Sequence, residues 1–367
     1  MGLITKKQEI LFGSARVDAL EPNASLPAKF DRILEILGLE KHIKDKAVAV
    51  KMHLGGNLGY TTIHPFFIRR LVAKLKEKEA RRVFICEEGG AVKKAVERGY
   101  TQEVVGAPIV EIDGPSRNYI VEKRVKYYGL RNIEIGGTIN DAEFMIVLSH
   151  VKGHGDCAYG GACKNVAMGC VTSKTRGQIH ELEGGLSWDA KKCDLCGKCV
   201  AACSHGAARI KKKKVEIFYH NCTWCRHCVL ACPNRAIENT NTKYQRFQVG
   251  MAITARQILS TFKPKHVLYI NFLTNITIFC DCWGFSTPSL VPDIGIMAGW
   301  DMAAIDAASL ASIKTRDLIP GSLPKGRKLG KGRHLFHKIH HKDPYIQIRE
   351  LERLGVGNPQ FKIVEVK

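Results

Sequence analysis

The chain has 367 residues, 45% of them hydrophobic and 25% charged, which is typical of a folded globular protein and gives no sign of long disordered regions. Lys and Arg outnumber Asp and Glu by 56 to 35, a formal net charge of +21. This excess favours an acidic or phosphate-rich partner. It is concentrated in a run of four lysines at 211–214 and in a tract near the C-terminus at 325–342, for which a solvated basic surface is the alternative.

Strand-like and helix-like segments alternate along much of the chain. Apolar runs predict strands at 47–52, 82–86, 108–112, 144–148 and 266–272. Amphipathic segments predict helices at 66–78, 91–98, 247–261 and 302–313. This rhythm predicts an α/β fold with a mainly parallel sheet and helices on both faces.

A cysteine-rich segment interrupts the alternation, and the α/β pattern resumes after it. We therefore expect an α/β domain in two parts, residues 1–187 and 241–367. Residues 188–240 are expected to form an inserted ferredoxin-like α+β module, and the second part of the α/β domain ends in the basic C-terminal segment.

The inserted segment contains eight cysteines in two runs with the same spacing, C-x-x-C-x-x-C-x-x-x-C. A loop with thiolates at steps of three holds three corners of a [4Fe-4S] cluster, and the fourth cysteine of each run ligates the other cluster. Cluster 1 is assigned to Cys193, Cys196, Cys199 and Cys232, and cluster 2 to Cys222, Cys225, Cys228 and Cys203. Paired zinc knuckles and a disulfide framework are the alternatives, but zinc favours two separated pairs and disulfides are rare in the cytosol.

Polar turns follow three of the predicted strands. In a parallel sheet these turns meet at the carboxyl edge, where α/β proteins bind ligands. Gly55, Gly56 and Gly59 are candidates for anion binding through backbone amides, although a tight turn also explains them. Lys152 and His154 add a cation and an imidazole, with a surface Lys and a hydrogen-bonded His as the alternative.

Further cysteines lie outside the two runs. A third metal or iron–sulfur site is predicted from Cys170, Cys280 and Cys282 with Cys157, Cys163 or His180. A redox-active thiol pair and simple burial, which we expect for Cys86, are the alternatives. The glycine turn before Cys170 adds candidate cofactor-binding residues, namely Gly160, Gly161, Lys164 and Asn165.

Two acidic residues mark the predicted helix at 302–313. Asp301 is expected to cap its N-terminus. Asp306 lies one turn further along an apolar helix, where it faces the site or caps a buried network.

Several stretches together resemble the domain of unknown function 362 family. They are Lys51-Met52-His53, Ser149 to His154, Gly160 to Cys170, Cys280-Asp281-Cys282, Pro292 to Gly295 and Asp301 to Asp306. The resemblance implies an archaeal or anaerobic bacterial protein but no particular activity. The family usually has a cysteine-free, glycine-rich stretch where this chain has Cys157 and Cys163, which makes these two weaker candidates than Cys170, Cys280 and Cys282. The first ferredoxin motif has Ser204 where a proline is usual, but proline is not a ligand.

These observations favour a redox protein in which two clusters relay electrons to or from a site on the α/β domain. The acceptor is a third cluster, a metal, a flavin or a bound substrate. Lys152 would hold an anionic group and His154 or His180 would handle a proton. The alternatives are an electron-transfer subunit of a larger complex and a maturation factor for another metalloenzyme.

The composition also bears on location and partners. Residues 1–7 contain no apolar segment like that of a signal peptide. The most apolar stretch, at 267–279, is too short and too polar to span a bilayer. We expect a cytoplasmic protein with an acidic redox partner such as a ferredoxin. Nucleic-acid binding is disfavoured because the basic tracts lack interleaved aromatic residues, and homo-oligomerisation is left open.

Overall fold

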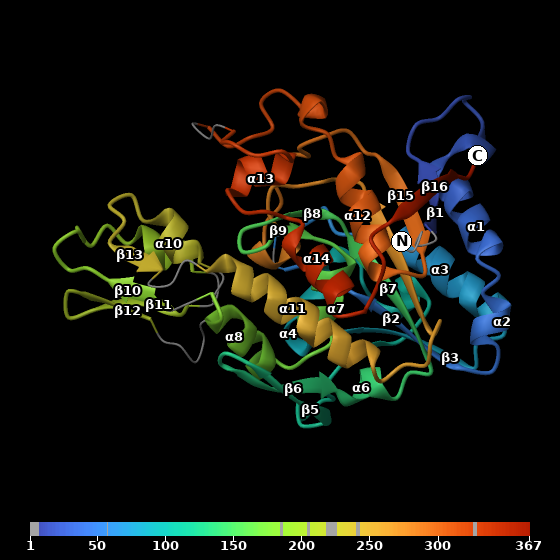
Figure 1. Ribbon diagram of the computed structural model, residues 1–367, viewed down its shortest axis with the longest axis horizontal. Helices are drawn as coiled ribbons and strands as arrows, with labels where there is room; N and C mark the ends of the chain where they lie inside the picture. The colour runs from blue at the N-terminus through green and yellow to red at the C-terminus, as the bar shows by residue number, and fades with distance from the viewer. Residues whose placement is uncertain are drawn as a thin grey trace, which may run out of the picture.

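The structure is a computed structural model that describes residues 7–56, 58–183, 186–203, 206–217, 226–239, 243–325 and 329–367. An eight-stranded sheet forms its centre, in the order β16-β1-β15-β14-β7-β2-β3-β4 (Figure 1). The strands are β1 (Gln8–Ser14), β2 (Ala47–Met52), β3 (Arg82–Glu87), β4 (Ile109–Glu111), β7 (Phe144–His150), β14 (Val267–Leu273), β15 (Gly295–Gly299) and β16 (Phe361–Glu365). Strands β14, β7, β2, β3 and β4 are parallel to one another, and β15 is antiparallel to β1 and β14.

Helices cover both faces of the sheet, which confirms the predicted α/β class. One face carries α1 (Leu26–Ile36), α2 (Glu40–Ile43), α3 (Pro65–Glu77) and α5 (Gln102–Val105). The other carries α7 (Ala162–Gly169), α8 (Ser173–Glu181), α11 (Tyr244–Leu259), α12 (Met302–Ser312), α13 (Leu335–His340) and α14 (Ile346–Arg353). The pleat divides the strands between two cores: Val48 and Val50 join one, and Ala49 joins the other.

Local sequence explains where the helices begin. Pro65 occupies the first turn of α3, where its missing N–H costs nothing. Asp301 caps α12 as predicted, because its carboxylate accepts the Ala304 N–H at 2.9 Å. The predicted strands and long helices agree with the observed ones to within a few residues.

The remaining elements of the α/β part are short. They are α4 (Gly89–Ala95), α6 (Gly137–Asn140), the hairpins β5 (Ile120–Tyr127)–β6 (Leu130–Gly136) and β8 (Lys152–His154)–β9 (Ala158–Gly160), and the 3-10 turns η1 (Pro22–Ala24), η2 (Val96–Arg98), η3 (Asp281–Trp283) and η4 (Thr315–Asp317). Within the described ranges, no helix combines the length and apolarity needed to cross a bilayer.

The cysteine-rich segment forms its own small elements and projects to one side of the sheet (Figure 1). They are β10 (Leu186–Trp188), α9 (Lys198–Ala201), β11 (Ala208–Lys211), β12 (Lys214–Ile217), α10 (His227–Ala231) and β13 (Ile237–Asn239). Strand β10 pairs antiparallel with β13, so the chain leaves and re-enters the α/β part at neighbouring positions. The division into domains remains a prediction.

Candidate functional site

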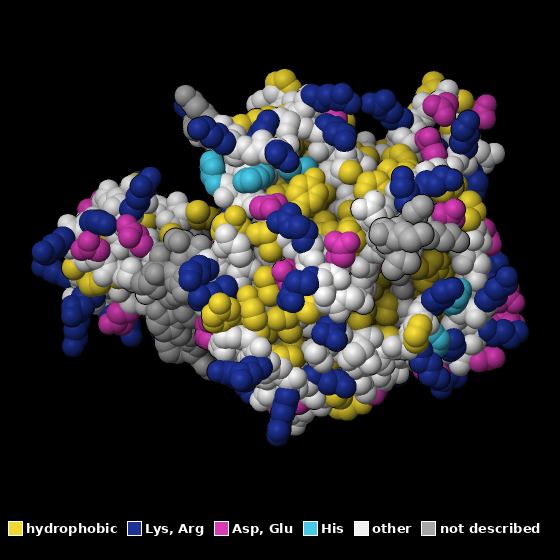
Figure 2. Space-filling view, in the orientation of Figure 1, with side chains coloured by type: hydrophobic (Ala, Val, Ile, Leu, Met, Phe, Trp, Pro, Cys, Tyr) yellow, Lys and Arg dark blue, Asp and Glu magenta, His cyan; other side chains and the backbone are white. Residues whose placement is uncertain are grey.

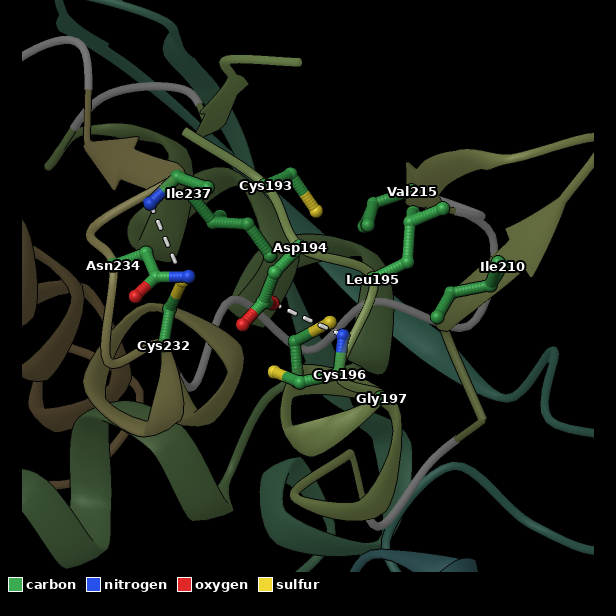
Figure 3. A pocket seen from close by; sticks show the side chains of 12 residues that line it. Cys193, Asp194, Leu195, Cys196, Gly197, Ile210, Val215, Cys232, Asn234 and Ile237 are labelled. Carbon is green, nitrogen blue, oxygen red and sulfur yellow. Dashed lines mark hydrogen bonds between the residues drawn. The ribbon is translucent and has the colours of Figure 1, made fainter. Parts of the chain in front are cut away.

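Four cysteines of the projecting segment line one cavity, shown in Figure 3. They are Cys193, Cys196, Cys199 and Cys232, the set that the spacing assigns to cluster 1. Apolar side chains including Leu195, Ile210, Val215 and Ile237 complete the lining. Cys232 thus crosses over from the second run to the cysteines of the first, an arrangement that fits four thiolate ligands of one iron–sulfur cluster.

The two cysteine runs share local geometry where both are described. Gly197 and Arg226 occupy equivalent positions, and both have left-handed backbones (φ 74° and 65°) just before a short helix. The last sulfur of each run accepts backbone N–H groups. Ala207 and Ala208 donate to Cys203 Sγ at 3.1 and 3.2 Å, and Ala236 donates to Cys232 Sγ at 3.2 Å.

Such N–H···S bonds stabilise thiolate ligands of iron–sulfur clusters. Of the cluster 2 set, Cys203 and the buried Cys228 are described. Cys222 and Cys225 lie outside the described residues.

A second group of polar residues lies at the carboxyl edge of the sheet. Strands β2, β3 and β7 are parallel neighbours, so the turns after them meet there as predicted. Lys51 Nζ lies 3.1 Å from Glu87 Oε2 and 3.1 Å from Asn165 Oδ1. His53 Nδ1 lies 3.0 Å from the same carboxylate oxygen. Burial favours a raised pKa for Glu87, but Lys51 and His53 outweigh it and hold the pKa at about 2.

This ion pair fixes the tautomer of His53. Its Nδ1–H donates to the Glu87 carboxylate, so Nε2 carries a lone pair in the neutral ring. That Nε2 atom is buried and has no hydrogen-bond partner among the described residues. Desolvation lowers the pKa of His53, which keeps the ring neutral. A carboxylate-oriented imidazole of this kind suits a base or a metal ligand.

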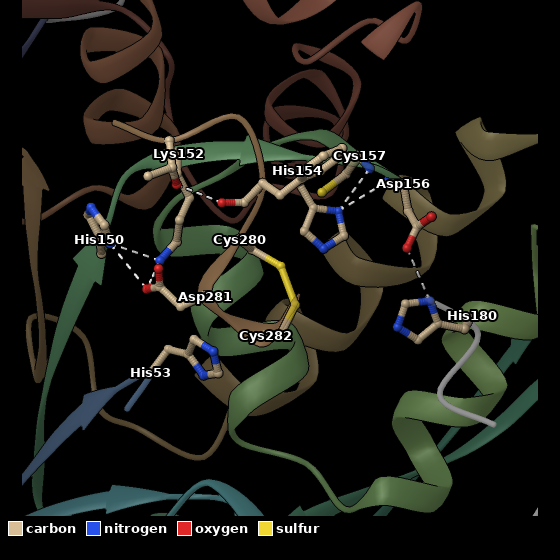
Figure 4. Close-up of a disulfide and its surroundings, with 12 residues drawn as sticks. His53, His150, Lys152, His154, Asp156, Cys157, His180, Cys280, Asp281 and Cys282 are labelled. Atoms are coloured by element: carbon tan, nitrogen blue, oxygen red, sulfur yellow. Dashed lines mark hydrogen bonds and ion pairs between the residues drawn. A yellow bond between two sulfur atoms is a disulfide. The ribbon is translucent and has the colours of Figure 1, made fainter. Parts of the chain in front are cut away.

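A buried group of charges lies beside it, between the end of β7 and the turn η3 (Figure 4). Lys152 Nζ donates to Asp281 Oδ2 and lies 2.9 Å from His150 Nδ1, which is itself 3.1 Å from Asp281 Oδ2. Burial lowers the pKa of Lys152 to about 8 despite Asp281. Burial alone would raise the pKa of Asp281, but Lys152 and His150 hold it well below the usual range. Lys152 is therefore already paired with Asp281.

Cys280 and Cys282 flank Asp281 and are joined by a disulfide (Figure 4). Cys280 is fully buried, whereas Cys282 is exposed. Within the described residues, His154 and these two cysteines form a group whose ligand atoms all lie within 4.8 Å of one another. With the disulfide reduced to two thiolates, these donor types would suit a soft metal ion.

Backbone contacts fix the orientation of His154. Its Nδ1 accepts N–H groups from Asp156 at 3.1 Å and Cys157 at 3.3 Å. The other ring nitrogen, Nε2, is turned toward the disulfide (Figure 4). Burial, with Lys164 nearby, lowers the pKa of His154 well below its ordinary value, so the ring is neutral.

A chain of polar contacts connects this group to the cysteine-rich segment. His180 Nδ1 lies 3.5 Å from Asp156 Oδ2. Glu183 lies close enough to Asp156 that burial and this second carboxylate raise the pKa of Asp156 to about 8. Glu183 accepts a 2.7 Å bond from Lys342 and lies 4.0 Å from the buried guanidinium of Arg226. Arg226 belongs to the second cysteine run, so the described part of that run is connected to the edge site through Glu183.

The predicted glycines serve close packing around the edge site. A Cβ on Gly56 would lie 3.2 Å from Gly284 Cα and 3.3 Å from Asp281 O. Gly55, which has a φ of +77°, and Gly59 belong to the same loop, which therefore packs against the η3 turn. On the other side, a Cβ on Gly161 would lie 2.4 Å from Asp306 Oδ1. Gly160 lies beside the Lys164 side chain.

Asp306 holds the start of α7. Its carboxylate accepts the backbone N–H groups of Ala162 and Cys163 at 2.8 and 2.9 Å and the Tyr159 hydroxyl at 2.9 Å. The amide groups at the N-terminus of α7 are thus occupied by a side chain of this protein. Asn165, further along α7, ties together Lys51 and the end of β7.

The other cysteines of the predicted third site lie elsewhere. Cys170 is buried near Lys51 and Cys86, and burial raises its pKa to about 12. Cys157 donates to Tyr159 O, and burial raises its pKa to about 12. Cys163 lies beside Asp306 at the start of α7.

Sequence reasoning missed several residues of the edge site. Lys51 entered only through the family resemblance and Glu87 only as the start of a polar turn, so neither was assigned a role, although a charged residue at the end of an apolar strand is a signal for a site. Asp281 was not assigned a role because the prediction for this turn used only the cysteines on either side of it. Asp156 and Glu183 carried no sequence signal, because only the fold brings them together.

Comparison with known proteins gives a family. Residues 48–311 match the family described as Domain of unknown function (DUF362). No curated protein matches the chain. Among solved structures, it is similar to a protein from Thermotoga maritima (10% identity, TM-score 0.36) and to the lactate racemase apoprotein from Thermoanaerobacterium thermosaccharolyticum (11% identity, TM-score 0.34).

These two alignments cover 68% of this chain and 50% and 49% of the others, so the chain spans about half the length of those structures. At this level of similarity, neither likeness indicates a shared activity. The family match covers well over half of the chain and includes both the cysteine-rich segment and the edge site. The chain therefore belongs to the DUF362 family.

Proposed function

We propose that this protein is an iron–sulfur redox protein in which two [4Fe-4S] clusters exchange electrons with a redox site at the carboxyl edge of the sheet. The observation that carries the proposal is the cavity lined by Cys193, Cys196, Cys199 and Cys232. Separate zinc knuckles would not need the last cysteine of one run beside the first three of the other. When bound, each cluster would take up and release one electron at a time.

The position of the second run supports delivery of electrons to the edge site. Arg226 and His227 are buried and directly precede Cys228. Arg226 faces Glu183, which lies beside Asp156 and, through it, His180. These contacts support cluster 2, rather than cluster 1, as the cluster that exchanges electrons with the edge site.

Exposure and charge support entry of electrons at the first run. Cys196 is exposed, and Ile210 and Val215, on the two strands of the β11–β12 hairpin, line the cluster 1 cavity. The turn of that hairpin and the two strand ends beside it carry the four lysines at 211–214. Lys and Arg side chains extend from the projecting segment in Figure 2. An acidic ferredoxin-like partner would be drawn to this end by electrostatic steering.

Crosswise ligation gives a direct test. Protein purified without oxygen should contain about eight irons and eight sulfides per chain and give cluster signals by EPR after reduction. Cys232→Ser should alter the same cluster signal as Cys193→Ser, although these residues belong to different runs. Cys228→Ser should alter the other signal.

The matched control is Cys86→Ser, a buried cysteine on β3 outside both runs, which should leave the iron content unchanged. Zinc in place of iron, or a Cys232→Ser spectrum that matches Cys228→Ser rather than Cys193→Ser, would contradict the proposal.

A further inference from the structure

We propose that Cys280 and Cys282 are the two-electron couple of the edge site, and that Lys164, a cation of the same site, binds the anionic group of a disulfide substrate. This inference rests on the proposed function for its source of electrons. It adds the reacting atoms, the reaction type and the chemical class of the substrate.

The two sulfurs differ in access as an exchanging pair requires. Cys282 is exposed on η3 and Cys280 is fully buried beneath it. A substrate disulfide therefore reaches Cys282 first, and Cys280 is left to resolve the mixed disulfide. The neighbouring turn holds this arrangement, because Leu58 N donates to Gly284 O at 2.7 Å.

The tautomer of His154 favours a thiol couple over a metal ion. Two backbone N–H groups point at Nδ1, so the proton of the neutral ring is on Nε2. A metal bound at Nε2 would displace that proton and leave Nδ1, still facing two donors, unable to accept it. An Nε2–H turned toward the sulfurs instead suits stabilisation of a thiolate.

Lys164 is the cation of the edge site that lacks a counter-ion. Lys51 is paired with Glu87, Lys152 with Asp281, and Lys342 with Glu183. Within the described part of the chain, the side-chain ammonium of Lys164 forms no hydrogen bond and no ion pair. It extends from α7 past Gly160, and a Cβ at Gly160 would lie 3.4 Å from its Cδ.

The charges that act on Lys164 are those of the same site. Burial lowers the pKa of Lys164, and the opposing influences come from Cys157, Asp281, Glu87 and Asp156. The three carboxylates already contact other groups of the site, namely Lys152, Lys51 and His180. An unpaired ammonium in a partly desolvated site binds an anion that enters from solvent.

The chemistry balances as two exchanges and one reduction. The Cys282 thiolate attacks the substrate disulfide, forms a mixed disulfide and releases one substrate thiolate. Cys280 loses its proton to solvent and attacks Cys282 Sγ, which releases the second thiolate and forms the Cys280–Cys282 disulfide. Reduction of that disulfide takes up two electrons and two protons, and the electrons come from the iron–sulfur donors of the proposed function.

The test uses the full protein and two disulfide probes that differ in charge. A phosphine reduces the Cys280–Cys282 disulfide directly, so the result does not depend on the clusters. After the phosphine is removed, the protein is mixed without oxygen with dithiobis(nitrobenzoate), which is dianionic, or with dithiodipyridine, which is uncharged. Each should give a fast phase that releases about two chromophoric thiols per chain.

Substitutions separate the roles of the residues. Cys282→Ser should abolish the fast phase, and Cys280→Ser should limit it to about one thiol per chain. Lys164→Met should slow the reaction of the anionic probe about tenfold and leave that of the neutral probe within about twofold, whereas Lys164→Arg should restore most of the difference. The exposed Lys331→Met is the charge-matched control and should change neither rate.

Three results would overturn the inference. They are a fast phase that survives in Cys282→Ser, equal slowing of both probes in Lys164→Met, and a metal ion in the purified protein that is lost in Cys280→Ser. Failure of the proposed function gives a different result. Dithionite would then reduce the clusters while the Cys280–Cys282 disulfide stayed oxidised, with both probe reactions of the phosphine-reduced protein intact.

Discussion

The eight-stranded sheet and the projecting cysteine-rich segment differ in what holds them together. The sheet buries apolar side chains on both faces, in two extensive cores. The described core of the segment consists of five buried residues, Cys199, Ala208, Val215, Cys228 and Ile237. Two of these are cysteines assigned to the clusters. A core of this size does not stabilise a segment of about 50 residues by itself.

This difference indicates two separate sources of stability in one chain. Apolar burial stabilises the sheet, whereas ligation of iron would stabilise the segment. The antiparallel β10–β13 pair closes the segment where it joins the sheet, so one part can lose structure while the other keeps it. The following predictions start with the largest expected effect.

Removal of iron should produce the largest difference in stability between the segment and the sheet. With the clusters stripped by a chelator, hydrogen exchange between 188 and 239 should approach that of an unfolded chain, while β2, β3, β7 and β14 keep their protection. The reason is that the segment would lose the ligand bonds that replace a core. Retention of protection in the iron-free segment would show that its small core suffices.

The buried charges of the edge site should contribute to the stability of the sheet and should not affect binding of the clusters. Asp281→Asn removes the anion that faces Lys152 and His150, so we expect a loss of about 4 kcal/mol in the free energy of unfolding. The iron content should stay unchanged. Adding Lys152→Met to this variant should recover part of the loss in chemical denaturation, because it removes the uncompensated charge. Equal destabilisation by the single and double variants would contradict this account of the pair.

Asp156, which lies between the edge site and the cysteine-rich segment, should make the stability of the protein depend on pH. Its folded pKa of about 8 exceeds the ordinary value of 3.8, so the folded protein binds this proton more tightly than the unfolded chain. Its contribution to stability is therefore complete below about pH 4 and is lost as the pH rises through about 8. Between pH 5 and pH 9 we expect a loss of about 4 kcal/mol that Asp156→Asn largely removes, measured by denaturation at several pH values. An unchanged pH slope in this variant would assign the effect to another group.

The lysines of the β11–β12 turn should increase the rate at which an acidic partner associates and should have little effect on the free energy of unfolding. Lys212→Glu with Lys213→Glu should slow electron transfer from an acidic ferredoxin about tenfold at low ionic strength, and less at high salt. Stopped-flow mixing at several salt concentrations measures this. The exposed Lys331→Glu, distant in the sequence, is the control. Similar slowing by the control would mean that net charge, rather than this surface, attracts the partner.

The sequence was sufficient for most of the fold. Strand β2 has the predicted bounds, and parallel strands were enough to predict that the turns holding His53, Glu87 and Lys152 share one edge. Repetitive spacing predicted that Cys232 serves the same cluster as the first run. Cys232 lines one cavity with Cys193, Cys196 and Cys199, while cluster ligation itself stays a prediction. These features depend on periodicity and spacing, which are local in the sequence.

The composition of the edge site was harder to predict because it depends on contacts between distant segments. His154 lies with Cys280 and Cys282, whereas Cys170, at the C-terminal end of α7, is buried near Cys86. The side chain of Lys164 can be identified as unpaired only from the structure, which shows that Lys51, Lys152 and Lys342 are paired with carboxylates. No spacing rule encodes either fact.

One measurement tests the central claim most directly, namely an anaerobic reductive titration with dithionite followed by trapping of free thiols. The account predicts about four electrons per chain, two for the clusters and two for the disulfide, with Cys280 and Cys282 trapped as thiols. The double variant Cys280→Ser, Cys282→Ser should take up about two electrons with the same cluster spectra. Uptake of two electrons by both proteins, with the native pair still oxidised, would contradict the account.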